Sequence, residues 1–97
     1  MRFEITESGK ICSDAGKDTL RNINECVQAA FDIEKQFWYN SIVDRSDRPK
    51  GCWLDQHAGV VWNNHETGNK YDKGEAICTK YGKYFFPYYI KTYNVYY

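Results

Sequence analysis

The sequence predicts a small, disulfide-linked α+β domain in which one main helix packs on a twisted antiparallel β-sheet. Three observations lead to this prediction. The 97-residue chain holds four cysteines, which is typical of a single small domain that covalent bridges stabilise. Residues 20–33 repeat apolar side chains at helical spacing. Several short segments outside this helix are rich in β-branched and aromatic residues, which favour strands.

The segment before the helix is predicted to hold a strand, a turn and a loop. Residues 3–7 alternate apolar and polar side chains, as a strand with one buried face does. Residues 8–10 are expected to turn, and residues 13–18 to form a loop. At the end of this loop, we expect Asp18 or Thr19 to cap the helix.

Residues 20–33 form the strongest helical pattern in the chain. Apolar side chains recur every three and four residues, so they share one face of the helix. Cys26 lies on that face, where it could form a disulfide to the sheet. Ala29 and Ala30 are small and would let the sheet approach closely. The side chains expected on the buried face are Leu20, Ile23, Cys26, Val27, Ala30 and Phe31.

The segments after the helix predict two further strands and a hairpin. Residues 37–43 favour a strand. Residues 52–55 and 59–64 predict the two arms of a hairpin, with the turn at residues 56–58. Residues 76–79 predict a short strand that closes the sheet.

The last segment differs in composition, so we divide the chain into a four-cysteine module, residues 1–80, and an aromatic, basic arm, residues 81–97. The arm contains more than half of the aromatic residues of the chain and no acidic residue. Its tyrosines and phenylalanines favour a strand. Pro87 restricts that strand to the edge of a sheet or to an extended arm, because proline cannot donate to a central ladder.

Charge and hydropathy argue against two classes of partner and bear on location. The net charge is zero, so the chain has no electrostatic bias toward nucleic acid or anionic membranes. No stretch reaches the roughly 20 apolar residues of a membrane helix. No signal peptide is visible, although the cysteines favour an oxidising compartment. A removed leader or a virus with its own thiol oxidation would reconcile these two signals, and we expect an extracellular or virion-surface location.

The four cysteines are expected to form disulfides rather than a metal site. Zinc sites usually contain closely spaced cysteine pairs, and here no cysteine is close to another in the sequence. Four cysteines allow three connectivities. We favour Cys26 with Cys52, which ties the helix to the hairpin, and Cys12 with Cys78, which ties the ends of the module.

The sequence gives little support for an enzyme, and we expect neither a catalytic site nor a cofactor. A nucleophile pair of Cys52 with His57 or His65 would need a reduced, accessible cysteine. The aspartates around Pro49 are expected to lie in a solvated loop, because paired catalytic carboxylates require a cleft that perturbs their pKa values.

Six short motifs in a fixed order resemble a known module. It is a small four-cysteine domain, often repeated, of predicted secreted and surface proteins in dinoflagellates, other algae and protists, and in large DNA viruses that infect them. The resemblance covers about residues 3–80; it departs from the module at residues 31–33, and the arm has no counterpart. It implies a disulfide-linked, non-catalytic surface or structural module. The motifs are Ser8-Gly9, Glu25-Cys26 with Ala29-Ala30, Arg48-Pro49-Lys50-Gly51-Cys52-Trp53, Gly59-Val60-Val61-Trp62-Asn63, Thr67-Gly68 and Ile77-Cys78.

The leading functional hypothesis is a structural or assembly subunit that uses the arm for protein–protein contacts. Tyrosine-rich surfaces suit interfaces, and an extended apolar edge tends to pair with another chain. The expected partners are further copies of the chain or other protein subunits. The predicted contact residues are Tyr84, Phe85, Tyr88, Tyr89, Tyr93 and Tyr96.

The alternative hypothesis is a carbohydrate-binding surface module on the hairpin and the loop of residues 63–69. Sugar rings stack on aromatic faces, and their hydroxyl groups bind amide side chains. The predicted contacts are Trp53, Asn63, Asn64 and His65. If Cys52 points inward, Trp53 lies on the opposite face of the strand and is partly exposed, whereas Trp62 is expected in the core.

Overall fold

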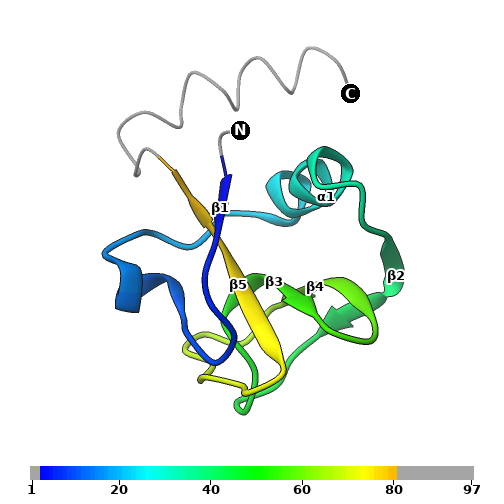
Figure 1. Cartoon of the computed structure of the whole chain (residues 1–97). Coiled ribbons are helices and arrows are strands. Elements are labelled where there is room, and N and C mark those ends of the chain that lie inside the picture. The colour runs from blue at the N-terminus through cyan, green and yellow to red at the C-terminus, as the bar shows by residue number, and fades with distance from the viewer. Residues whose placement is uncertain (1–2, 81–97) are drawn as a thin grey trace.

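The computed structural model describes residues 3–80, apart from the side chains of residues 38–40, as one helix on a five-stranded sheet (Figure 1). This confirms the α+β prediction with two disulfides. The predicted strand or arm at residues 81–97 and its six contact residues lie outside the described residues. The elements are β1 (Phe3–Ile5), the 3-10 helix η1 (Cys12–Ala15), α1 (Ile23–Asp32), β2 (Phe37–Val43), β3 (Gly51–Asp55), β4 (Gly59–Asn63) and β5 (Gly74–Thr79).

The sheet is mixed, which corrects the prediction of an antiparallel sheet. Its strand order is β1-β5-β3-β4-β2, and every pair is antiparallel except β2 with β4. The hairpin predicted at residues 52–64 is present as β3 and β4. After β2 the chain crosses to β3, and β4 then returns between these two strands. Strands β2 and β4 both run opposite to β3, so they are parallel to each other.

Helix α1 begins later than predicted, at Ile23, because Asn22 caps it. The Asn22 Oδ1 atom accepts a hydrogen bond from the Glu25 backbone N–H at 3.0 Å. The Glu25 carboxylate in turn accepts one from the backbone N–H of Arg21 at 2.6 Å. These two bonds satisfy N–H groups that have no partner within the helix. The predicted caps, Asp18 and Thr19, therefore lie outside the helix.

The buried face of α1 is also rotated from the predicted one. Glu25, Cys26, Ala29 and Ala30 are buried, whereas Val27 is 41% exposed and Phe31 is 78% exposed. The two alanines lie where the sheet approaches the helix most closely, and the Cys26–Cys52 disulfide fixes this contact. The larger Val27 and Phe31 side chains are consequently directed away from the sheet.

Glu25 is expected to make the stability of the fold depend on pH. Burial of its carboxyl group raises its pKa above 4.5, and the hydrogen bond from Arg21 only partly offsets this effect. The folded protein then holds the Glu25 proton more tightly than the unfolded chain does. The stability that this group contributes is therefore complete below pH 4.5 and is lost as the pH rises through the higher folded pKa.

Glu25→Gln should remove this loss. In urea unfolding at pH values from 4.5 upward, the variant should gain stability relative to the wild type as the pH increases. Glu66→Gln, at an exposed position, is the control and should follow the wild-type curve. Parallel curves for the wild type and Glu25→Gln would show that Glu25 does not cause the pH dependence.

The main core lies between α1 and one face of the sheet. Cys52 and Val60 of the hairpin, Ile77 of β5 and Phe3 of β1 pack there against Cys26 and the alanines of α1. Trp62 and Leu54 are partly buried and pack against the same cluster. Alternation along the strands sends the neighbouring side chains, Trp53, Val61 and Ala76, to the opposite face.

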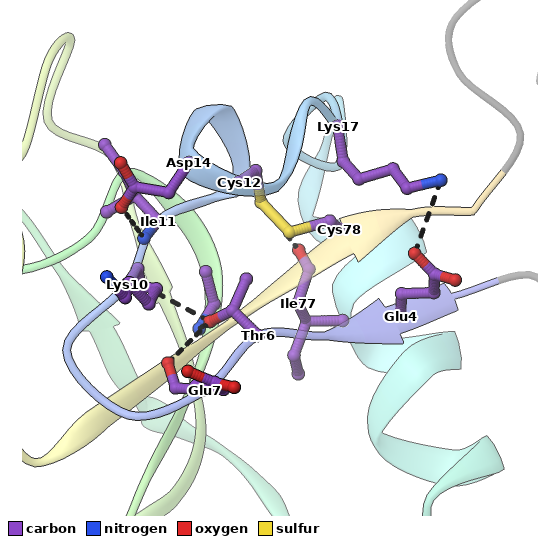
Figure 2. The surroundings of a disulfide bond; sticks show 11 residues. Glu4, Thr6, Glu7, Lys10, Ile11, Cys12, Asp14, Lys17, Ile77 and Cys78 are labelled. Atoms are coloured by element: carbon purple, nitrogen blue, oxygen red, sulfur yellow. Dashed lines mark hydrogen bonds and ion pairs between the residues drawn. A yellow bond between two sulfur atoms is a disulfide. The ribbon is translucent and has the colours of Figure 1, made fainter.

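Both predicted disulfides are present, with the favoured connectivity. Cys26 bonds to Cys52 inside the main core, and Cys12 bonds to Cys78 on the other face of the sheet. Figure 2 shows the second bridge, which holds η1 against β5. Beside it, Lys17 forms an ion pair with Glu4 at 3.4 Å.

Candidate functional site

An open groove lies on the face of the sheet opposite α1, and we call it the sheet groove. Its floor consists of Trp53 from β3, Val61 from β4, and Ser41 and Val43 from β2. Its volume is about 680 Å³, within the range of about 300–1,000 Å³ that is common for binding sites. The charged and polar residues around the floor include Glu34, Lys35, Arg45, Arg48, Asp55 and His57.

The Trp53 side chain is held from one side by an aromatic and cationic stack. Its ring meets the Tyr71 ring edge to face, with 5.7 Å between the centroids and 85° between the planes. The Arg48 guanidinium carbon lies 3.7 Å from the centre of the Tyr71 ring, a cation–π contact. Gly74 leaves space for the indole, because a Cβ atom there would lie 2.8 Å from Trp53 Cε3. The indole is consequently held by Gly74 and Tyr71.

The indole N–H of Trp53 is an unsatisfied donor within the described part of the chain. Trp53 is only 3% exposed, and its Nε1 atom has no hydrogen-bond partner among residues 3–80. A buried donor without a partner costs about 1–3 kcal/mol. An acceptor that reached this N–H through a small movement of the groove floor would satisfy it.

Asp47 ties together the two arginines of the sheet groove. Arg45 makes two bonds of 3.0 Å to the Asp47 carboxylate, and Arg48 approaches the same carboxylate at 3.1 Å. The hydrogen bond from Arg45 is the main reason that the pKa of Asp47 lies below its usual 3.8. These exposed ion pairs contribute little to stability, but they neutralise much of the positive charge at this end.

Asp55 shapes the other end of the sheet groove. Its carboxylate accepts the backbone N–H groups of His57 and Ala58 at 2.8 and 3.0 Å, which fixes the tight turn between β3 and β4. Gly59 follows with a positive φ of 86°, and Gln36 O lies 2.9 Å from where a Cβ atom would be. The turn and the end of the α1–β2 connection are thus held together.

The predicted carbohydrate residues do not form one accessible surface. Trp53 is buried rather than partly exposed, because its ring lies against Gly74 and Tyr71. Asn63 is 1% exposed; its amide donates to three backbone carbonyls, of Arg45, Arg48 and Pro49, at 2.9–3.1 Å. Its carbonyl oxygen accepts the backbone N–H groups of Arg45 and His65. Asn63 therefore has no polar atom left for a ligand.

Asn64 and His65 also have roles within the protein. Asn64 is exposed, and its Oδ1 accepts a hydrogen bond from the indole N–H of Trp62 at 2.7 Å. The Nδ1 atom of His65 accepts the backbone N–H groups of Thr67 and Gly68. We expected Trp62 in the core. Its side chain packs against the main core but remains partly exposed. The loop of residues 63–69 is thus organised around its own hydrogen bonds.

The sequence did not indicate the sheet groove, because its residues, all between Glu34 and Val61, come together only through the order of the strands in the sheet. Only the alternation of Ser41 and Val43 on β2 was a usable signal for a shared face. Among residues 3–80, no group of three or more histidine, cysteine or acidic side chains could hold a metal ion, and no helix is long and apolar enough to cross a membrane.

Comparisons with known proteins add no assignment. Neither the family models nor the curated proteins nor the solved structures give a match to this chain. The function is therefore argued from its residues alone.

Proposed function

We propose that the protein is a non-enzymatic structural or assembly subunit of an extracellular or virion surface structure, and that its tyrosine-rich segment makes the protein–protein contacts. The observation that supports this best is a division of roles along the chain. All four cysteines of the body form disulfides, and its buried asparagine binds the protein's own backbone. The segment after residue 80 instead holds more than half of the aromatic residues of the chain.

The chemistry of the segment suits a protein interface. Tyrosine buries a large ring at low conformational cost and keeps a hydroxyl group for hydrogen bonding. The lysines Lys83 and Lys91 and the absence of acidic residues disfavour pairing of the segment with itself. The proposed contact residues are Tyr84, Phe85, Tyr88, Tyr89, Tyr93 and Tyr96.

The surface of the body offers apolar contact points as well. Val27 and Phe31 are one helical turn apart on the outer face of α1, and both are exposed. Ile5, on the edge strand β1, is 37% exposed.

Deletion of residues 84–97 tests the proposal. The deletion keeps every cysteine and all of residues 3–80, so the body should keep its two disulfides and its melting temperature. Light scattering coupled to size exclusion, without reductant, should show self-association for the full chain and a monomer for the deletion. A deletion variant that assembles like the full chain would refute the role of the segment.

We do not advance carbohydrate binding as a second function. Trp53 offers no exposed ring face for stacking on a sugar, and Asn63 has no free amide group. The remaining predicted contacts, Asn64 and His65, bind their own loop and Trp62.

A further inference from the structure

We propose that the sheet groove is the receptor for the tyrosine-rich segment of a second copy of the chain. This inference rests on the proposed function and names the surface that the segment would contact. Three observations lead to it: the unsatisfied donor on the floor, the combination of apolar floor and polar rim, and the charges at the two ends of the groove.

The unsatisfied donor is on the correct side of the indole. The edge of the Trp53 ring that carries Cε3 and Cζ3 lies against Gly74 of β5. Nε1 is on the opposite edge of the ring, away from β5. The sheet order places β4 and β2, which supply the rest of the floor, on that side of β3. This N–H is buried in the free chain, so it would donate to a tyrosine hydroxyl or a peptide carbonyl after a small movement of the side chains around it.

The lining of the groove suits tyrosine better than a sugar or a purely apolar ligand. Val43 and Val61 provide an apolar floor beside Trp53, and the side chains above them are polar or charged. An amphipathic ring can bury its face on such a floor while its hydroxyl bonds to the floor donor or the rim. No aromatic ring lies flat and exposed on the floor among the described residues, since Trp53 is 3% exposed, so sugar stacking is disfavoured.

The charges of the groove also favour this segment. Asp47 offsets one of the two positive charges of Arg45 and Arg48 at one end. At the other end, Glu34 and Asp55 line the groove together with Lys35, so the two carboxylates outnumber the lysine. The segment carries Lys83 and Lys91 and no acidic residue, so it complements this end.

The segment is long enough to reach another molecule. It follows β5, which β3 separates from the two strands that complete the floor of the groove. Residues 84–97 span up to about 45 Å when extended, at about 3.3 Å per residue. A segment of this length can cross from one body to the groove of a neighbour.

A matched pair of substitutions on β2 tests the inference in the full-length chain. Val43 lines the groove, whereas its neighbour Ile42 lies on the opposite face of the strand. Val43→Asp should weaken self-association at least about tenfold, because tyrosine rings would bury an unpaired charge. Ile42→Asp should assemble like the wild type. Ala58→Arg fills the groove from an exposed position and replaces Val43→Asp if the latter fails to fold.

Mixing two defective chains makes the test specific. A chain that lacks residues 84–97 keeps the groove, and a Val43→Asp chain keeps the segment. The Val43→Asp chain alone should be monomeric at concentrations where the wild type assembles. It should nevertheless capture the deleted chain through its intact segment, whereas a deleted chain that also carries Val43→Asp should not be captured.

The outcomes separate this inference from the proposed function. If deletion gives a monomer but Val43→Asp and Ala58→Arg both assemble like the wild type, the groove is not the receptor and the segment remains the interface. If the deleted chain assembles like the wild type, or if the wild type is itself monomeric, both proposals fail.

Discussion

Reduction of both disulfides is expected to unfold the protein without any denaturant. The bridges close loops of 66 and 26 residues. In the chain-entropy model, such bridges contribute about 4 and 3 kcal/mol. Small domains have a total stability of about 5–15 kcal/mol, so the loss of both bridges removes most or all of it. Far-ultraviolet circular dichroism of protein reduced in denaturant and then diluted into reducing buffer should show an unfolded chain.

Variants that lack a single bridge provide the controls for this prediction. Cys12→Ala with Cys78→Ala should lose about 4 kcal/mol, and Cys26→Ala with Cys52→Ala about 3 kcal/mol plus the cost of lost core packing. Both should remain folded at low temperature. A fully reduced protein with a native spectrum would mean that the core of α1 and the sheet suffices without the bridges.

Replacement of Asn63 by alanine is expected to cause the largest loss of any single substitution outside the cysteines. The Asn63 side chain makes five hydrogen bonds to backbone groups and is 1% exposed. It joins β4 to the loop between β2 and β3, so its loss leaves several buried donors and acceptors without partners. Since each such group costs about 1–3 kcal/mol, we expect a loss of about 4 kcal/mol in the free energy of unfolding in urea.

The neighbouring residue is the matched control for Asn63. Asn64 is also an asparagine, but it is exposed and makes one side-chain bond, to the indole of Trp62. Asn64→Ala should therefore cost about 1 kcal/mol or less. Equal losses for the two alanine variants would show that the buried network around Asn63 does not support the fold.

Local sequence patterns predicted where the helix and the strands lie better than they predicted which strands pair. The hairpin was predictable because Asp55 and the turn at residues 56–58 lie between its two strands and define it locally. The parallel pairing of β2 with β4 was not predictable, because it joins residues that are remote in sequence, such as Phe37 and Val60. The helix was predicted with the wrong first residue, because the chain offers three capping residues before it and only Asn22 has Glu25 at the reciprocal position.

The candidate site depended even more on long-range structure. Alternation along β3 correctly placed Cys52 and Trp53 on opposite faces, but it could not show that Tyr71 would pack against Trp53. Asn63 looked like a ligand-binding amide because the sequence does not reveal that a loop 14–18 residues earlier would wrap around it. The sheet groove requires the order of β3, β4 and β2, which is a property of the folded chain.

The mass of the intact, non-reduced protein in solution most directly tests the proposal that this chain is an assembly subunit. Sedimentation or light scattering over a range of concentrations should give masses that rise above the 11.5 kDa of the single chain toward multiples of it. A mass that stays at 11.5 kDa at every concentration would contradict self-assembly through the tyrosine-rich segment.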